Sequence, residues 1–285
     1  MNGQPLDARG SEDKHILITG CSSGIGRQTA ITLVNMGYIV YGTVRRPADS
    51  DDLYKLNLRN LVPICPLDLT NLQHIKKIAD VLAAEIRRRQ GSRLYALINN
   101  AGGGLPNPLE LMDMDMFRTE VNARIVGSVA LVQALLPLIR RGKGRIIWIS
   151  TPALIPTPYV ASIHACDFAV NCIARTLEIE LKPWGIRNTM IRCGGIKTPA
   201  GLRTTSDVHT VLRHASPDRT SLYVKAFTKW GEDMALFDRK RTDPERVAQA
   251  VLAALVVAKP KHHYRVGHMS RAAAFLEALP QPVSD

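Results

Sequence analysis

The sequence predicts an α/β fold, a single domain built on a doubly wound parallel sheet with helices on both faces. Short apolar runs rich in β-branched residues alternate with longer segments of helical period, which is the pattern of βαβ units. A cluster of glycines lies between the first apolar run and the first helical segment. The chain of 285 residues is long enough for one sizeable core and short for two enzymatic domains.

Each expected element follows from its periodicity. The expected strands are the apolar runs 15–19, 38–44, 61–67, 94–98, 145–150 and 186–192, and a short run near Tyr264. The expected helices are the segments 25–36, 72–89, 109–140, 162–181 and 244–257. The stretch 194–240 has no clear periodicity, and two interpretations stay open, a substrate-binding loop or a pair of surface helices.

Composition limits the class of protein. The domain is expected over 15–270, between a polar N-terminal tail (1–14) and a C-terminal tail (271–285). No apolar run is expected to reach the roughly 18 residues that span a bilayer, and no secretory signal is expected. Five cysteines without a C-x-x-C pair favour reduced thiols in a cytoplasmic protein and no metal site. The net charge of +12 lacks interleaved aromatic residues, so we expect no nucleic acid partner.

The glycine cluster predicts a dinucleotide site of the Rossmann-like kind. It reads Thr19-Gly20-Cys21-Ser22-Ser23-Gly24-Ile25-Gly26, and its glycines would let the backbone approach a pyrophosphate at a helix N-terminus. Arg45 and Arg46 follow the second expected strand, where an NAD site usually has an acidic residue. A guanidinium suits a 2′-phosphate, so the sequence predicts NADP(H), with Ser23 as a second contact. The expected cofactor residues of this part are Gly20, Ser22, Ser23, Gly24, Ile25, Gly26, Arg45 and Arg46.

Three further motifs follow the glycine cluster along the chain. They are Leu67-Asp68-Leu69-Thr70, Asn99-Asn100-Ala101-Gly102 and Cys193-Gly194-Gly195-Ile196-Lys197-Thr198-Pro199. With them, the chain resembles the short-chain dehydrogenase/reductase family over nearly its whole length after the tail. The third motif is similar to the family's P-G-x-x-x-T-P, with cysteine where proline is usual.

The resemblance assigns roles to these motifs. It implies that Asp68 and Leu69 contact the adenine, and that Asn100, Ala101 and Gly102 line the cofactor. It also implies that the backbone of Ile196 holds the nicotinamide carboxamide and that Thr198 approaches the diphosphate. A small-molecule substrate is implied, and so is a homodimer or homotetramer that pairs through the helices around 109–140 and 160–182.

The catalytic positions of the family are altered. Family members use a tyrosine acid, a serine that binds the substrate oxygen, a lysine that lowers the tyrosine pKa, and an asparagine that holds a water. Tyr159-Val160-Ala161-Ser162-Ile163 is similar to the family's Y-x-A-S-K, which implies Tyr159 as acid/base with Ile163 in the lysine place. The serine place falls on Thr151, beside Ser150, after a loop shorter than usual, and the asparagine place falls on Arg124.

Ile163 cannot lower the pKa of a phenol, because that requires a nearby cation. Arg124 is the expected replacement cation for Tyr159; alternatively, it binds a substrate carboxylate or polarises a carbonyl. His164 and Asp167 lie five and eight residues after Tyr159, and packing or interface roles are expected for both.

Three hypotheses about function stay open. The preferred one is an atypical NADP(H)-dependent oxidoreductase acting on a carbonyl or an alcohol, with Tyr159 as acid/base, Thr151 or Ser150 orienting the oxygen, and Arg124 as cation. The second is an enzyme without redox chemistry, an isomerase, cyclase or dehydratase that keeps the cofactor pocket. The third is an inactive protein that senses the cofactor.

Overall fold

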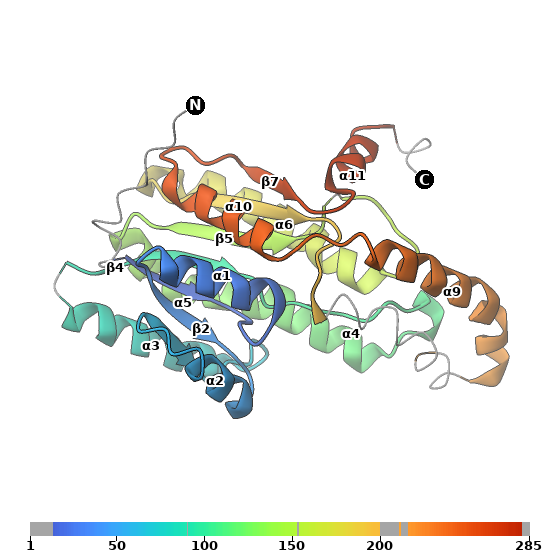
Figure 1. Cartoon of the computed structure of the whole chain (residues 1–285), viewed down its shortest axis with the longest axis horizontal. Coiled ribbons are helices and arrows are strands. Elements are labelled where there is room, and N and C mark those ends of the chain that lie inside the picture. Colours follow the sequence, from blue (N-terminus) through green and yellow to red (C-terminus); the bar gives the residue numbers. More distant parts are fainter. Residues whose placement is uncertain (1–13, 90, 153, 200–210, 212–215, 281–285) are drawn as a thin grey trace.

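The computed structural model describes residues 14–89, 91–152, 154–199, 211 and 216–280. These residues form a seven-stranded sheet of order β3-β2-β1-β4-β5-β6-β7, in which every neighbouring pair is parallel. Helices cover both faces of the sheet (Figure 1). The predicted doubly wound parallel sheet is therefore confirmed.

The elements follow the chain in alternation. The strands are β1 (Lys14–Ile18), β2 (Ile39–Thr43), β3 (Leu61–Ile64), β4 (Arg93–Asn99), β5 (Arg145–Ser150), β6 (Arg187–Cys193) and β7 (His263–Val266). The α-helices are α1 (Gly24–Asn35), α2 (Pro47–Tyr54), α3 (Leu72–Arg88), α4 (Met114–Val121), α5 (Ser128–Arg141), α6 (Ala161–Leu181), α9 (Pro217–Asp238), α10 (Glu245–Val256) and α11 (Ser270–Glu277). Short 3-10 turns lie at Leu109–Leu111 and Lys182–Trp184, and a π-helical segment spans Asn122–Gly127.

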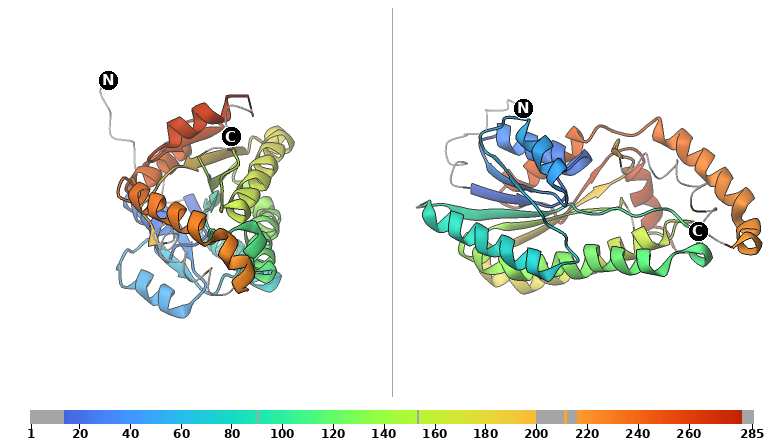
Figure 2. Two further views of the ribbon diagram at one scale, coloured as in Figure 1. Left: turned by 90° about the vertical axis from the view of Figure 1, so that its right-hand side faces the viewer. Right: turned by 90° about the horizontal axis from the view of Figure 1, so that it is seen from below.

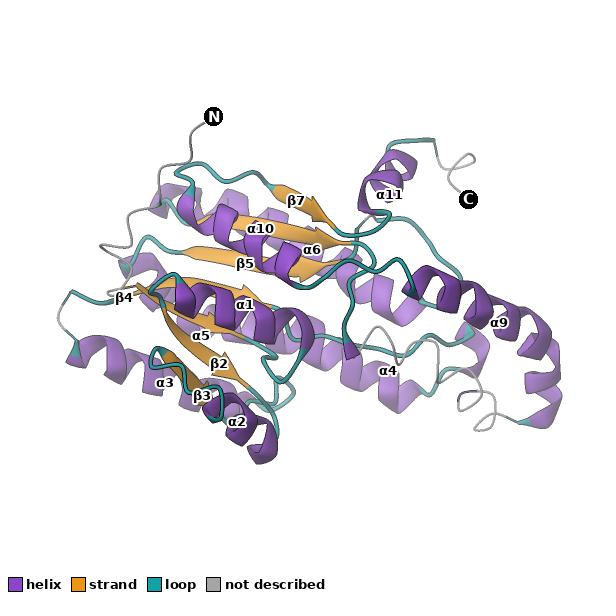
Figure 3. Cartoon of the chain, viewed as in Figure 1, coloured by secondary structure: helices purple, strands orange, loops and turns teal. Residues whose placement is uncertain are grey.

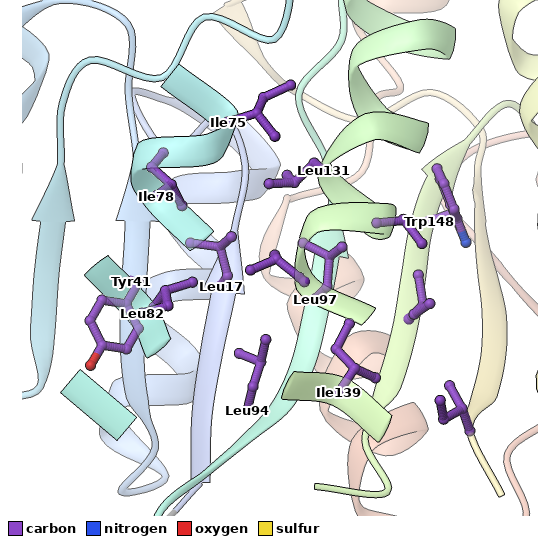
Figure 4. Packing of buried hydrophobic residues seen from close by; sticks show 14 of the residues in the cluster. Leu17, Tyr41, Ile75, Ile78, Leu82, Leu94, Leu97, Leu131, Ile139 and Trp148 are labelled. Carbon is purple, nitrogen blue, oxygen red and sulfur yellow. The ribbon is translucent and has the colours of Figure 1, made fainter. Parts of the chain in front are cut away.

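Two apolar layers hold the sheet. Successive side chains of a strand point to opposite faces, so Ile16 and Ile18 of β1 pack with α1 and α10, and Leu17 packs on the other face with α3 and α5. Figure 4 shows the second layer, where Leu17, Leu97 and Leu131 lie together. Burial on both faces explains why the strands are apolar throughout, as the sequence predicts.

The segment expected as one helix over 109–140 is more complex. It begins with a 3-10 turn, and the continuous helix runs over Met114–Arg141 with the π-helical segment inside it. Gly127 ends that segment, and a Cβ there would lie 2.0 Å from the carbonyl oxygen of Leu69. The absence of a side chain therefore lets this helix approach the segment after β3 closely.

Helix Met114–Arg141 also corrects an expectation about membranes. It has 28 residues and a mean hydropathy of 1.5 over its most apolar window, so by length and composition it could cross a membrane. However, Leu131, Leu135 and Ile139 on its inner face are fully buried in the core. This burial is that of a helix packed on its own sheet.

Two other segments differ from the sequence predictions, and a third contains a helix where the sequence leaves two interpretations open. The strand expected over 61–67 ends at Ile64, and a cis peptide bond follows between Cys65 and Pro66. The stretch 194–240, which lacks clear periodicity, contains the 22-residue helix α9; residues 200–210 and 212–215 lie outside the described residues. Figure 2 shows α9 extending beyond the body of the sheet.

The expected C-terminal tail, 271–285, also differs, because its first seven residues belong to helix α11, which is tied to the sheet. Arg192 of β6 is 8% exposed and donates hydrogen bonds to both carboxylate oxygens of Glu277 at 2.9 and 2.6 Å. Glu277 also accepts from the backbone N–H of Leu154 at 3.3 Å. Helix α11 therefore braces the loop that follows β5. Residues 1–13 of the expected N-terminal tail and residues 281–285 lie outside the described residues.

Candidate active site and cofactor cleft

All strands end on the side of the molecule toward which α9 extends (Figure 3). The carboxyl ends of parallel strands are where ligands bind in open α/β sheets. The glycine loop after β1, the segment after β4, Ser150 at the end of β5 and the segment after β6 all lie at this edge.

Hydrogen bonds fix the glycine loop to the end of β4. The side-chain N–H₂ of Asn100 donates to the carbonyl oxygens of Thr19 at 2.8 Å and of Gly20 at 3.0 Å. The hydroxyl of Thr19 accepts from the backbone N–H groups of Asn100 and Ala101 at 3.0 and 2.9 Å. The predicted cofactor residues Gly20, Asn100 and Ala101 are thus held in one rigid unit.

The glycine loop leaves the N-terminus of α1 open. A Cβ at Gly26 would lie 2.3 Å from the carbonyl oxygen of Gly20 and 2.4 Å from the side-chain nitrogen of Asn100. Ser23 is the N-cap residue and makes no side-chain capping bond, and the first turn of α1 has no acidic residue. The backbone N–H groups and the helix dipole are therefore suited to a pyrophosphate, and the loop fits the predicted dinucleotide.

The segment after β6 lies against this loop. A Cβ at Gly24 would be 3.0 Å from the Thr198 methyl carbon, so Thr198 covers the turn that begins α1. Ile196 is buried, and its carbonyl oxygen accepts from the Arg241 guanidinium at 3.2 Å. The structure therefore brings Thr198 to the glycine loop, and it holds Ile196 beside Arg241.

The predicted adenosine contacts lie after β2 and β3. Arg46 makes a two-point ion pair with Asp49 at 2.9 and 2.7 Å, whereas Arg45 is exposed and donates to no acceptor in the described part of the chain. Asp68 accepts from the hydroxyl and the N–H of Thr70, and these two bonds lower the pKa of its carboxyl. Arg45 is thus the guanidinium available for a 2′-phosphate.

A buried charge network joins two of the predicted catalytic residues, Arg124 and Ser150. Arg124 lies in the π-helical segment and donates to Glu120 at 2.9 Å, to the carbonyl oxygen of Ile163 at 3.1 Å and to Asp167 at 2.8 Å. Ser150 donates to the same oxygen of Asp167 at 3.2 Å. The side chains of Arg124, Glu120 and Asp167 are only 12, 11 and 6% exposed.

Burial shapes the electrostatics of this network. Burial raises the pKa of the Asp167 carboxyl, and the Arg124 guanidinium opposes that rise. Burial lowers the pKa of Arg124, but the neighbouring acidic groups, Asp167 foremost, outweigh it and raise the value. Removing charges from water is costly, so each of these charges depends on its partner.

Thr151 forms a second polar pair beside this network. Its hydroxyl is 3.3 Å from Nε2 of His164, and Nδ1 of the same ring is 3.1 Å from the carbonyl oxygen of Ile155. A carbonyl oxygen only accepts, so we assign the ring proton to Nδ1, which leaves Nε2 as the acceptor of the Thr151 proton. His164 and Asp167, expected in packing or interface roles, therefore contact Thr151 and Ser150, the predicted substrate-orienting residues.

Tyr159 lies apart from these residues. It precedes helix α6 and has a φ of 67°, a left-handed conformation that is uncommon for residues other than glycine. Its ring packs on Phe227 and Trp230 of α9, with centroids 4.9 and 5.6 Å apart. The polar contacts of Arg124 go to Glu120, Ile163 and Asp167, which corrects the expectation that Arg124 serves Tyr159 as a replacement cation.

The contacts favour a second alignment of the family motif. Y-x-A-S-K requires a tyrosine and a lysine four residues apart, and Ile163-His164-Ala165-Cys166-Asp167 lies wholly inside α6 and faces β5. In this register Ile163 takes the tyrosine place and Asp167 takes the lysine place. The positive charge beside this part of α6 then belongs to Arg124, which pairs with Asp167. The short loop before Tyr159 was the available sequence signal, since this register lengthens the loop by four residues.

Comparisons with known proteins agree with this geometry. The profile of the family described as short chain dehydrogenase matches residues 14–208. A 3-amino-tetrahydro-pyrrolizinone reductase of Xenorhabdus hominickii is 28% identical over 256 residues, covering 89% of this chain and 87% of the relative. Human 17-beta-hydroxysteroid dehydrogenase type 1 is 30% identical, and the match covers 87% of this chain and 76% of the relative. The oxidoreductase YbbO of Escherichia coli is 30% identical, and the match covers 93% of this chain and 90% of the relative.

Solved structures share the fold. A short-chain dehydrogenase from Streptomyces avermitilis superimposes with a TM-score of 0.75 at 22% identity, covering 93% of this chain and 92% of the other. A short chain dehydrogenase from Burkholderia cenocepacia in complex with NADP superimposes with a TM-score of 0.68 at 22% identity, covering 92 and 91%. Both likenesses extend over the sheet and its flanking helices.

Proposed function

This chain belongs to the short-chain dehydrogenase/reductase family, a family of oxidoreductases, and from this premise we propose that it is an atypical NADP(H)-dependent oxidoreductase. Its substrate is a small molecule with a carbonyl or an alcohol group. The observation that carries the proposal is the hydrogen-bonded pair of Thr151 and His164 at the carboxyl end of β5, beside the glycine loop and its partner strand β4. The expected cytoplasmic location remains a prediction.

In the proposed reaction, Thr151 and His164 bind the substrate oxygen and transfer its proton, and Asp167 and Arg124 hold them in position. NADPH, when bound on the glycine loop, supplies a hydride. The Thr151 hydroxyl holds the substrate oxygen. In carbonyl reduction this hydroxyl passes its proton to the substrate oxygen and is reprotonated from Nε2 of His164 in its imidazolium form; in alcohol oxidation the neutral ring accepts the proton at Nε2. The carbonyl of Ile155 keeps Nε2 turned toward Thr151. Asp167 and Arg124 hold Ser150 and helix α6 in place beside them.

The acid/base is tested by three substitutions at two positions. We expect Thr151→Val and His164→Gln to reduce turnover on the order of 10² to 10⁴-fold while NADPH binding is kept. Thr151→Ser keeps the hydroxyl and should retain most of the activity. The assay follows the absorbance of the reduced nicotinamide with a panel of aldehydes, ketones and alcohols.

Tyr159, the acid/base predicted from the sequence, is the matched comparison. If Tyr159→Phe abolishes turnover while His164→Gln does not, the proton comes from Tyr159 and the assignment to His164 is wrong. The two variants therefore decide between the alternative acids by the same assay.

The coenzyme preference is tested at Arg45. We expect Arg45→Gln to weaken NADPH binding about 10- to 100-fold and to leave NADH binding unchanged, because a charge-assisted bond to the 2′-phosphate is lost. Arg46→Gln is the control, since Arg46 already pairs with Asp49. Fluorescence titration of both coenzymes measures the effect. Equal weakening of NADPH and NADH would contradict a phosphate contact.

A second candidate function is chemistry without net redox change, as in an isomerase, cyclase or dehydratase that keeps the NADP(H) pocket. The presence of Asp167 in the lysine place favours it, because a carboxylate cannot lower the pKa of a phenol or an alcohol. NADPH binding without turnover on any substrate of the panel would favour this function over the first.

We also propose a homodimer or homotetramer. Val126 and Ile179 are 53 and 76% exposed, and they lie on the helical segments through which the resemblance implies pairing. Burying such side chains in a partner would remove apolar surface from water. Light scattering of the purified chain measures its mass, and a monomer would contradict the proposal.

A further inference from the structure

A groove of about 690 Å³ opens at the outer edge of the sheet, between α10 and the turn that joins β7 to α11. Three arginines and a histidine line it, and its lining includes no aspartate or glutamate. The polar side chains that matter here are those of Arg246, Gln249, Arg265, His268, Ser270 and Arg271. We propose that this groove, called the oxyanion groove below, binds the phosphoryl group of a small molecule.

The charges of the oxyanion groove are poorly neutralised. Arg246 and Arg271 are exposed, and within the described part of the chain their side chains form no hydrogen bond or ion pair. Arg265 makes one contact of 3.5 Å with Glu277, whose nearer partner is Arg192. Guanidinium groups that share one concave surface raise its positive potential and attract anions.

The N-terminus of α11 adds backbone donors to the same groove. Met269 is the N-cap residue and provides no side-chain cap. The backbone N–H groups of Arg271 and Ala272 find no acceptor among the described residues, although the N–H of Ser270 bonds to the carbonyl of Gly267. The first N–H groups of a helix and its dipole favour a negative group at this end.

The oxyanion groove is separate from the cofactor cleft. The segment after β6 lies between them, since the N–H of Gly195 donates to the carbonyl of His268 and the N–H of Thr242 donates to the carbonyl of Gly195, both at 2.9 Å. The predicted 2′-phosphate contacts, Arg45 and Arg46, follow β2, which is four strands away from β6 in the sheet order. A phosphate in the groove is therefore a different ligand from the coenzyme.

The chemistry of the lining selects the ligand class. Guanidinium forks bind phosphate oxygens with two parallel bonds, and several forks suit a dianion. The volume exceeds that of a free phosphate, so an organic group is accommodated beside the phosphoryl group. The shared chemistry is that of a phosphate dianion, whether it is free or carried on an ester.

The test is calorimetric titration of the NADPH-loaded protein with inorganic phosphate and with glycerol 3-phosphate. We expect one site per chain, and an affinity at least about tenfold lower in the Arg246→Gln, Arg271→Gln double variant. The control is Arg187→Gln, an exposed arginine at the amino end of β6, which should bind as the parent does. Tighter binding of the ester would identify a phosphorylated small molecule as the ligand; equal binding would identify free phosphate.

Two results would overturn the proposal: no heat at millimolar phosphate, or equal affinity in the double variant and the parent. If the protein does not bind NADPH, the titration is repeated in the Arg45→Gln background, which removes the other expected phosphate contact. Failure of the proposed function and failure of the oxyanion groove are thereby distinguished. Each single variant, Arg246→Gln and Arg271→Gln, provides a second comparison in case the double variant does not fold.

Discussion

Gly26→Ala abolishes NADPH binding, with a loss of affinity on the order of 100-fold or more. The added Cβ would lie 2.3 Å from the carbonyl oxygen of Gly20 and 2.4 Å from the side-chain nitrogen of Asn100. Neither neighbour can retreat, because Asn100 holds Thr19 and Gly20 and the loop joins a buried strand. The loop must move, and the N–H groups expected to bind the pyrophosphate move with it. Fluorescence titration with NADPH measures the loss.

Gly42→Ala is the matched control for Gly26→Ala. Gly42 lies in the neighbouring strand β2, and a Cβ there would meet Cys21 and Leu61 at 3.4 Å, an ordinary contact distance. We expect its NADPH affinity to stay within a few-fold of the parent. If Gly26→Ala bound NADPH as well as Gly42→Ala does, the assignment of this loop as the cofactor site would be wrong.

Arg124→Met lowers the free energy of unfolding by about 3–5 kcal/mol, because it leaves the carboxylates of Glu120 and Asp167 buried without their cation. The methionine fills a similar volume, so the loss reports the charges more than a cavity. With the cation gone, the pKa of the Asp167 carboxyl rises further. Its protonated form is then favoured in the folded state, so the destabilisation is smaller in mildly acidic than in mildly alkaline buffer. Chemical denaturation at both pH values measures it.

A double-mutant cycle separates the ion pair from general disruption. Arg124→Met combined with Asp167→Asn should cost less than the sum of the single variants, because Asp167→Asn removes the charge that the first substitution leaves unpaired. Arg118→Met is the control, since Arg118 pairs with Asp115 on the surface, where 67 and 91% of the two side chains are exposed. Its effect should lie within about 1 kcal/mol. Additive losses in the cycle would show that Arg124 and Asp167 do not stabilise each other.

The sequence predicts the observed elements best where the pattern that predicts them lies within a few neighbouring residues. The period of the apolar residues predicts β1, β2, β4, β5 and β6 to within a residue or two of their bounds, because burial on both faces of a covered sheet leaves a continuous apolar run. The glycine loop is predicted for a similar reason, since close approach of the backbone admits only glycine. The polar sequence of α2 and the short α11 lack such a signal, so periodicity predicts neither helix.

The catalytic side could be predicted only in part. Family spacing predicts Ser150, Thr151 and Arg124 as site residues, and the structure brings them together through His164 and Asp167. The motif around Tyr159 predicts a catalytic tyrosine, yet Tyr159 lies before α6 and packs on the aromatic side chains of α9. A motif of four or five letters fits two registers that differ by one helical turn, and nothing local decides between them.

Local patterns in the sequence predict the parallel sheet, the glycine loop and the altered positions, because periodicity and glycine placement act over a few neighbouring residues. The tertiary structure alone decided which partner each altered residue has. Arg124 and Asp167 are 43 residues apart in the chain, and their pairing exists only because the two helices that carry them pack together and exclude water. A buried charge without an opposite charge nearby destabilises the fold, so the pairing is set by which helices pack together and not by any local sequence pattern.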